Sequence, residues 1–467
     1  MRAIPVEVSP VLSDVLRAVL SAAEISALTP RREPLPDAVG DMRARLQRSG
    51  QWRAGQMAGR RWPVACVSLE ITQRCNLDCT LCYLSESSEA VRDLPLEEVF
   101  RRIDMVLAHY GPGTDVQVSG GEPTLRRRDE LIAIVARIHQ RGLRASLFTN
   151  GIRATRELLI ELAQAGLTDV AFHVDLTQQR AGFASEADLN ALRAEYIERA
   201  RGLGLGVFFN TTVHAANAGE VPMLAAFFAA QAEVVRFASF QLQAETGRGV
   251  LGGRVAAISN DSVAAQLCAG VGTPLRFNTL LSGHHDCNRS AVVFVVDGRA
   301  FDAFDDEAFI QRFMRETANL RIDRGTQWRA AVSLLKAGLT RPRLALAALR
   351  WGIAFAWKAR RELIAARGRV HKLTLFTHNF MDACSLDRDR IDACVFMAVT
   401  QHGPMSMCAY NAKRDDYLLQ ALPTSKGEWQ PLGLVKEQPI KFLKGRAREA
   451  WLLARNGVSV PAQEHNA

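Results

Sequence analysis

The segment Cys75-Asn76-Leu77-Asp78-Cys79-Thr80-Leu81-Cys82 places three cysteines within eight residues. It follows a largely apolar run over 66–71, which predicts a strand that ends at this loop. Thiolates are soft ligands that suit zinc, copper(I) or iron–sulfur clusters. A closed iron–sulfur site usually takes four cysteines, so a loop with three leaves one iron free to bind a small molecule.

Two alternatives compete with a cluster at this loop. One is a zinc site, but zinc ribbons usually take their ligands from two separated pairs. The other is a group of buried free thiols, which does not fit a polar loop that also contains Asn76 and Asp78. We therefore interpret the loop as an iron–sulfur site.

A second motif, Gly120-Gly121-Glu122-Pro123, follows a strand-like run over 115–118. On its own it is typical of any turn from a strand into a helix, because glycine accepts backbone conformations that other residues avoid. A third run, Leu147-Phe148-Thr149-Asn150-Gly151, has the pattern of a strand end. The order of the three motifs along the chain is more informative than any one of them.

In this order the motifs resemble those of the radical S-adenosylmethionine (radical SAM) superfamily. The resemblance implies a [4Fe–4S] cluster on Cys75, Cys79 and Cys82, whose open iron binds S-adenosylmethionine (SAM). It also implies that an electron from the cluster cleaves SAM to methionine and a 5′-deoxyadenosyl radical, which abstracts hydrogen from a substrate. Leu81 stands where superfamily members commonly have an aromatic residue, which leaves a backbone contact to the cofactor there. The methionyl amine is implied to lie at the second motif, on Gly120, Gly121, Glu122 and Pro123.

Strand-like and helix-like segments alternate between residues 63 and 250, in six strand-plus-helix units. Such alternation is typical of parallel sheets, and the resemblance implies an α/β fold with a partial (β/α)6 barrel of the TIM type. Active sites of such barrels lie at the carboxyl ends of the strands. By analogy with the superfamily, three polar residues at these ends are predicted to contact the cofactor: Asn150, Asp175 and Asn210. The alternative is that they only satisfy the backbone of nearby loops.

The rest of the 467 residues forms extensions around this barrel. We expect a helical N-terminal extension over 1–62, with helices near 11–28 and 37–57. After the barrel we expect an irregular segment over 251–324, a basic amphipathic helical segment over 325–372, a cysteine-containing region over 373–421 and a tail over 422–467.

The positive charge of the chain is concentrated in one segment. Residues 325–372 contain eleven basic residues and one acid, a net charge of +10, whereas the whole chain carries +9. The stretch from Leu344 to Trp357 is rich in Leu, Ala and Trp, but it is too short and too charged to span a bilayer. It suits an interfacial helix on anionic lipid, and the alternative is a helical lid over the barrel mouth. No nucleic acid is expected as a partner, because aromatic residues are not interleaved through a basic polar groove.

Four cysteines lie beyond the barrel: Cys287, Cys384, Cys394 and Cys408. They are numerous enough for an auxiliary [4Fe–4S] cluster or a tetrahedral iron or zinc site, and His285 or His378 could replace one of them. The alternative is four unpaired thiols, because free cysteine is often simply buried. The remaining two cysteines, Cys66 and Cys268, lie in a predicted strand and a predicted helix, and we assign both to the core.

The composition is typical of a soluble globular enzyme, with 48% hydrophobic and 23% charged residues. The chain has nine cysteines, an odd number, and seven of them fall in metal-type groups, which favours a reducing compartment over disulfides. The N-terminal segment also lacks the apolar core of a signal peptide. We therefore expect a cytoplasmic protein, peripheral at the inner membrane face if the basic segment binds lipid, with an electron donor such as flavodoxin or ferredoxin.

Three later stretches resemble tetraether-synthase-like members of the superfamily, which couple unactivated lipid chains: the run over 241–249, Asp286-Cys287 and the run over 405–412. Those proteins carry further cysteines upstream of the radical SAM motif, whereas here none precedes Cys66. The resemblance implies hydrogen abstraction from a hydrophobic, lipid-derived substrate. The alternatives are modification of a peptide or protein, and a non-catalytic metal protein that senses redox state.

Overall fold

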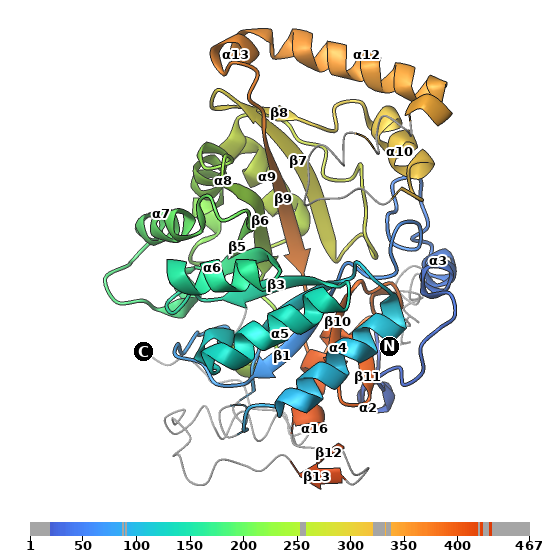
Figure 1. The fold of residues 1–467 in the computed structure, drawn as a ribbon, viewed down its shortest axis with the longest axis vertical. Coiled ribbons are helices and arrows are strands. Elements are labelled where there is room, and N and C mark those ends of the chain that lie inside the picture. Colours follow the sequence, from blue (N-terminus) through green and yellow to red (C-terminus); the bar gives the residue numbers. More distant parts are fainter. Residues whose placement is uncertain are drawn as a thin grey trace, which may run out of the picture.

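The computed structural model describes residues 19–85, 91–252, 258–320 and 338–418, together with residues 88 and 332 and two short paired strands, β12 (Ala421–Pro423) and β13 (Trp429–Pro431). The first part of the predicted helix over 11–28 and most of the predicted tail over 422–467 lie outside the described residues. The described chain is built around one sheet of eleven strands, flanked by helices (Figure 1).

Six parallel strands form the centre of this sheet, each paired with the next along the chain. They are β1 (Cys66–Thr72), β2 (Asp115–Gly120), β3 (Arg144–Thr149), β4 (Leu167–His173), β5 (Gly206–Val213) and β6 (Val235–Leu242). The helices that follow them are α4 (Leu96–Tyr110), α5 (Arg128–Gln140), α6 (Arg156–Gln164), α7 (Leu189–Ala200), α8 (Val221–Ala230) and α9 (Asn260–Val271). The predicted partial (β/α)6 barrel is thereby confirmed.

Alternation of side chains along each strand fixes the two faces of the sheet. In β1, Val67, Leu69 and Ile71 are fully buried in the main hydrophobic core, which they share with the surrounding helices. Ser68 and Glu70 point to the other face, because successive side chains of a strand alternate. Burial of each large aliphatic side chain contributes about 1.5–3 kcal/mol, so a slip by one residue is strongly disfavoured.

Strands from later in the chain extend the sheet at both edges. The strand β9 (His371–Asn379) pairs with β6, and β10 (Phe396–Thr400) pairs with β1, both in parallel. Antiparallel strands complete the edges: β7 (Asn288–Val296) and β8 (Arg299–Asp302) beyond β9, and β11 (Gly403–Ser406) beyond β10. The cysteine-containing region predicted over 373–421 is therefore not separate from the barrel, because it supplies strands to both sides of it.

Two predictions about the extensions are wrong. The segment over 251–324, expected to be irregular, contains α9, β7, β8 and a further helix, α10 (Glu307–Glu316). The apolar run over 291–296 was the signal for β7 in the sequence. Near the N-terminus, α2 (Ala22–Ala27) and α3 (Ala38–Arg48) are helical, but α3 ends well before residue 57. It ends where Ser49 is followed by Gly50, which adopts a left-handed backbone.

Residues 325–331 and 333–337 of the basic segment lie outside the described residues, and its described part forms two helices, α12 (Pro342–Lys358) and α13 (Arg360–Ala365), far from the barrel mouth. The aromatic ring of Phe355 packs on Phe294 of β7, and Phe294 pairs with Lys372 near the start of β9. In Figure 1, α12 lies across one end of the molecule, whereas β1 and β9 point toward the other. The predicted alternative of a lid over the mouth is therefore wrong for α12 and α13, the described helices of this segment. No helix in the described part of the chain combines the length and the apolarity needed to cross a membrane.

Candidate functional site

The three-cysteine loop leaves the carboxyl end of β1 and keeps its thiols partly exposed. Burial, with a smaller contribution from the neighbouring thiol of Cys82, raises the pKa of Cys75 to about 11. Burial also raises the pKa of Cys79 well above its usual value, with both other thiols adding to the effect. The charges of these thiols influence one another, so the three sulfur atoms share one loop region, but they do not all lie within 4.8 Å of one another as the ligands of a single metal ion would.

Hydrogen bonds from the ends of three other strands hold this loop. After β3, Asn150 Nδ2 donates to Asn76 Oδ1 at 2.7 Å. After β4, the carbonyl of Thr177 accepts the backbone N–H of Thr80 at 2.9 Å. After β6, the backbone N–H of Gly249 donates to the carbonyl of Cys82 at 3.1 Å. The loop is thereby fixed at the mouth of the barrel, next to an ion pair of Arg248 and Asp78 at 2.8 Å.

The second motif packs its backbone directly against the first strand. Gly120 has a φ of +131°, and a Cβ there would overlap the carbonyl oxygen of Thr72. A Cβ on Gly121 would overlap the carbonyl oxygen of Arg74. The Tyr83 hydroxyl, one residue after the third cysteine, donates to the carbonyl of Gly120 at 2.7 Å. Glycine is thus required by close approach, and the two motifs form one unit.

Replacing Gly120 by Ala is expected to destabilise the protein by about 3 kcal/mol, since both backbone strain and a clash with backbone oppose it. Chemical unfolding of the purified variant measures this. Gly182→Ala is the matched control, because Gly182 also has a positive φ, +88°, but open space around it. The Gly182→Ala control should lower the free energy of unfolding by about 1 kcal/mol. Equal losses in the two variants would contradict the close packing described here.

Glu122 acts as a structural residue in this arrangement. Its side chain is completely buried. One carboxylate oxygen accepts from the hydroxyls of Thr124 at 2.6 Å and Thr149 at 2.7 Å, and the other accepts the backbone N–H of Asn150 at 2.7 Å. The carboxylate therefore joins the ends of β2 and β3, and the cofactor contact predicted for this residue is left to its backbone.

Asp175 and Asn210 lie at the same end of the barrel, but only Asn210 is partly exposed. The Asp175 carboxylate is fully buried and accepts from His173 at 2.6 Å and from the backbone N–H of Thr212 at 2.7 Å. Despite burial, these contacts hold its pKa well below the usual range. The buried Asp175 carboxylate is therefore not placed to make the predicted contact with the cofactor. Burial lowers the pKa of His173, but the charge of Asp175 outweighs this and raises it.

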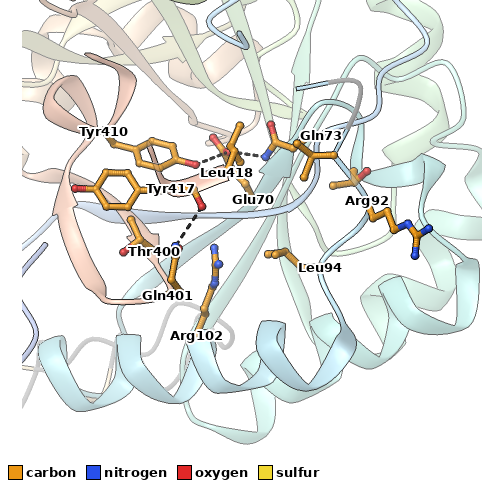
Figure 2. A pocket seen from close by; sticks show the side chains of 12 residues that line it. Glu70, Gln73, Arg92, Leu94, Arg102, Thr400, Gln401, Tyr410, Tyr417 and Leu418 are labelled. Carbon is orange, nitrogen blue, oxygen red and sulfur yellow. Dashed lines mark hydrogen bonds between the residues drawn. The ribbon is translucent and has the colours of Figure 1, made fainter. Parts of the chain in front are cut away.

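A buried ion pair of Arg414 and Glu70, missed in the sequence, joins the C-terminal region to this site; Figure 2 shows Glu70 with two further donors, Tyr410 and Gln73. Arg414 of α16 (Arg414–Leu418) donates to both carboxylate oxygens of Glu70 at 2.6 Å. Its guanidinium lies over the rings of Tyr83, at 4.7 Å, and Tyr410, at 4.6 Å. The Tyr410 hydroxyl and Gln73 Nε2 also donate to Glu70. Arg414 therefore contacts the residue that follows the third cysteine and the strand that precedes the loop.

The distal cysteines only partly come together. A pocket between β7, β9 and β10 is lined by Cys287, Cys394 and Cys408, with His284 and His378. Cys384 is exposed and does not line it. The four sulfur atoms do not converge as a single tetrahedral zinc ion requires, with metal–sulfur bonds of about 2.3 Å. This result argues only against a single metal ion, because an iron–sulfur cluster holds its thiolates further apart.

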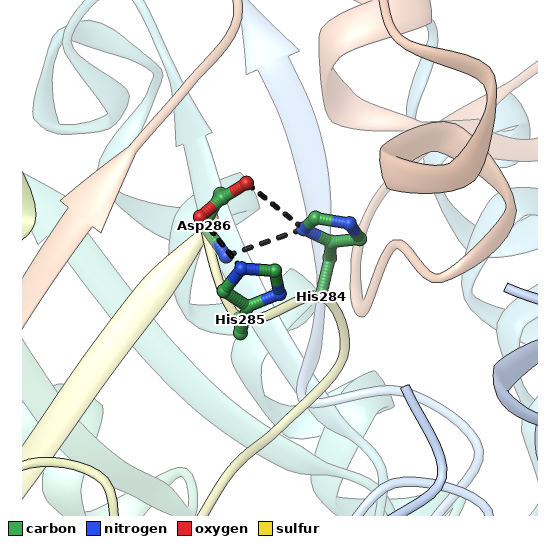
Figure 3. Close-up of side chains that lie close together, drawn as sticks. All are labelled: His284, His285 and Asp286. Atoms are coloured by element: carbon green, nitrogen blue, oxygen red, sulfur yellow. Dashed lines mark hydrogen bonds and ion pairs between the residues drawn. The ribbon is translucent and has the colours of Figure 1, made fainter. Parts of the chain in front are cut away.

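His285, one predicted substitute ligand, points away from this pocket, and its neighbour His284 lines it instead. Figure 3 shows His284, His285 and Asp286 close together, with the two imidazole rings stacked at 4.7 Å. His285 Nε2 lies 3.0 Å from Asp286, and its Nδ1 lies 3.0 Å from Gln51. Burial lowers the pKa of His284 to about 4 and that of His378 to about 3. Both imidazoles are therefore neutral at pH 7, the form that binds metals.

The cysteines assigned to the core lie in the predicted elements. Cys66 is buried in β1, and Cys268 is half-buried in α9, where its sulfur accepts the backbone N–H of Leu275 at 3.3 Å.

Arg390 is a residue that the sequence did not single out. Its Nε lies 3.4 Å from the sulfur of Cys287.

Comparison with known proteins gives one family. Residues 69–227 match the model of the Radical SAM superfamily. Among curated proteins, the chain is similar to 7,8-dihydro-6-hydroxymethylpterin dimethyltransferase of Methanocaldococcus jannaschii, with 28% identity over 39% of this chain and 37% of that protein. It is also similar to PqqA peptide cyclase of Bradyrhizobium diazoefficiens, with 33% identity over 33% of this chain and 41% of that protein. A third relative is Fe-coproporphyrin III synthase of Methanosarcina barkeri, with 31% identity over 34% and 39%.

These matches span less than half of each relative. The crystal structure of Streptococcus suis SuiB bound to precursor peptide SuiA covers 49% of this chain and 48% of that one, at 14% identity. Its TM-score of 0.34 is too low to support an argument about the site. The family match begins within β1, includes the three-cysteine loop and the second motif, and ends within α8. Residues 69–227 of this chain form a radical SAM superfamily domain.

Proposed function

We propose that this protein reductively cleaves SAM at a [4Fe–4S] cluster on Cys75, Cys79 and Cys82 and removes a hydrogen atom from a hydrophobic substrate. The observation that carries the proposal is that three partly exposed thiols stand in one short loop held by the ends of β2, β3, β4 and β6. The chemistry of this donor set fits a cluster with one open iron. When bound, the cluster supplies the electron for cleavage.

Residues around the loop fit a small polar cofactor. The close packing of Gly120 and Gly121 against Thr72 and Arg74 fixes the second motif beside the loop. Asn210 and His173 offer partly exposed polar groups, 3.5 Å apart, at the ends of β5 and β4. We assign SAM to this part of the mouth, with Leu81 and Asn150 as neighbours on the loop and on β3.

An aromatic row on the inner face of the sheet supports a hydrophobic substrate. The ring centroids of Phe208 and Phe237 lie 5.2 Å apart, those of Phe237 and Phe376 5.3 Å, and those of Phe376 and Phe396 6.2 Å. All four are half-buried, whereas Phe209, one residue along β5, packs against α8 in the core. The row therefore faces the barrel interior, where an apolar part of a substrate can be bound.

The aromatic row gives a test of the substrate class. Phe237→Ser is expected to lower turnover of a hydrophobic substrate about tenfold or more, because one buried aromatic contact is worth over 1 kcal/mol. Cleavage of SAM without substrate should be retained. The control is Phe227→Ser, which alters a half-buried ring on α8, outside the barrel interior. Product formation from lipid extracts and 5′-deoxyadenosine are measured in parallel, and unchanged turnover in Phe237→Ser would contradict the assignment.

A peptide or protein is the second candidate substrate. PqqA peptide cyclase is named for a peptide, and it matches the radical SAM region of this chain. The position of α12 also favours a substrate that arrives from water, because the basic segment does not border the mouth. Incubation with candidate precursor peptides and with lipid extracts separates the two classes, since only a true substrate acquires a new mass. A redox sensor, the third alternative, predicts a bound cluster without cleavage of SAM.

A second metal centre remains part of the proposal. Cys287, Cys394 and Cys408 share one pocket with two neutral imidazoles, a donor set that fits an iron–sulfur cluster with a histidine ligand. The measurement is the iron and sulfide content of anaerobically reconstituted protein in which Cys75, Cys79 and Cys82 are all Ala. About four irons per chain retained would establish the second cluster. Complete loss of iron would leave these thiols as structural residues.

The remaining partners follow from the chemistry. An electron donor such as flavodoxin or ferredoxin is required if the reaction is reductive, and stimulation of SAM cleavage by either protein tests this. We place the protein in the cytoplasm and propose contact with a membrane surface through the basic segment.

A further inference from the structure

The helix α12 exposes a continuous apolar stripe to solvent. Its members are Leu346, Leu349, Ile353 and Trp357, with exposed fractions of 49, 59, 60 and 71%. Their spacing of three, four and four residues keeps them within an arc of about 80° on the helix. Ile364 of α13 continues the exposed apolar surface with an exposed fraction of 80%. Large aliphatic side chains so exposed and so aligned mark an interaction surface.

The opposite side of α12 is firmly attached to the protein. Phe355 packs its ring edge against Phe294 at 5.3 Å and Phe301 at 5.8 Å. Trp351 Nε1 donates to one oxygen of Asp305 at 3.2 Å, and the Lys358 ammonium lies 3.3 Å from the other. One side of α12 therefore already packs against the protein, and the exposed stripe is a separate side of the helix.

Basic side chains border the stripe on one side. Arg343 and Arg350 are exposed and lie about 60–80° around α12 from the centre of the stripe, and Arg361 is exposed on α13. None of the three is paired with a carboxylate in the described part of the chain. Arg360 lies over the ring of Trp357 at 4.8 Å. The surface thus combines an apolar ridge with uncompensated positive charge.

We propose that this ridge, defined as the stripe with its three bordering arginines, docks on an anionic membrane surface. A helix with aliphatic and Trp side chains on one side and arginines beside them inserts its apolar face at the level of the headgroups. The arginines then lie near anionic phosphates. Complementarity of charge selects this partner over a neutral surface, and the convex helix offers no groove for a folded ligand.

The fold gives this docking a fixed direction. The ridge lies at the end of the sheet where β9 begins, and the three-cysteine loop lies at the carboxyl end of β1 (Figure 1). When docked, the mouth of the barrel therefore faces away from the bilayer. A substrate reaches it from water or through a carrier, and not by direct extraction from the membrane beneath the protein.

Sedimentation with vesicles tests the ridge without any need for the radical chemistry. Wild-type protein should sediment with phosphatidylglycerol-containing vesicles and remain in solution with pure phosphatidylcholine. Arg343→Ser/Arg350→Ser/Arg361→Ser should weaken binding by on the order of 100-fold, and Leu349→Ser/Ile353→Ser/Trp357→Ser should abolish it. The control is Arg48→Ser/Arg153→Ser/Arg236→Ser, which removes the same charge from exposed sites elsewhere and should bind within a few-fold of wild type.

Any of the following three results would overturn the proposal. Wild-type protein that does not sediment has no such surface, and equal loss in the control triple variant would assign binding to net charge. A dimer that the Leu349→Ser/Ile353→Ser/Trp357→Ser variant dissociates, without vesicle binding, would assign the stripe to a second copy of the chain. Because SAM cleavage is measured separately, failure here leaves the proposed reaction unaffected.

Discussion

Replacing Cys79 by Ala is expected to abolish reductive cleavage of SAM, with 5′-deoxyadenosine formation at least about three orders of magnitude below wild type. With two of three thiols left, the cluster loses a ligand and its defined open position. The fold should survive, because the thiol is partly exposed in a loop whose backbone is held by other hydrogen bonds. Chromatography of the products under anaerobic, reducing conditions measures the effect.

A matched control is Cys268→Ala, which removes a half-buried thiol from α9, away from the loop. It should retain cleavage close to that of wild type after the same reconstitution. Cleavage at wild-type rate in Cys79→Ala would remove the basis for the proposed function. Loss in both variants would indicate damage during reconstitution or folding, which circular dichroism detects.

Arg414→Met is expected to destabilise the protein by about 3–5 kcal/mol, because it leaves Glu70 as an uncompensated buried charge. The side chains of this pair have exposed fractions of only 2% and 5%. Urea unfolding measures the change. The control is Arg128→Met, which breaks an exposed ion pair with Glu161 of similar length, 2.7 Å, and should cost no more than about 1 kcal/mol.

A double variant separates the charge from the packing. In Arg414→Met/Glu70→Leu no buried charge remains, so this variant should recover part of the stability lost in Arg414→Met. It also removes the contact of Arg414 with Tyr83, and SAM should bind more weakly even where stability returns. If Arg414→Met costs less than 1 kcal/mol, the pair is not buried as described.

Much of the barrel was predictable because its signals are local. The alternation of strands and helices between residues 63 and 250 was predicted, and the three-cysteine loop stands directly after an apolar run that forms β1. Each unit of strand and helix buries a face defined by its own periodicity. The family resemblance then supplied the SAM chemistry of the loop, whereas the loop by itself indicated only an iron–sulfur site.

The remaining features depend on contacts between distant parts of the chain. Glu70 and Arg414 are 344 residues apart, and nothing near either one marks it as part of a pair. The parallel pairing of β10 with β1 equally depends on residues more than 300 positions apart. Asp175 was predicted as a cofactor contact from its place at a strand end, but its orientation toward His173 and Thr212 is set by tertiary packing. The sequence also favoured His285 as a ligand, whereas the structure places His284 in the pocket. Which of two adjacent residues faces the pocket is likewise set by tertiary packing.

The most direct test of the central claim is electron paramagnetic resonance of the reduced, reconstituted protein with and without SAM. The account predicts a [4Fe–4S] signal in the wild type that changes when SAM is added, because SAM binds the open iron of the cluster on Cys75, Cys79 and Cys82. In the triple Ala variant this SAM-sensitive signal should be absent. A wild-type signal that does not respond to SAM, or a responsive signal that persists in the triple variant, would contradict the assignment of the site.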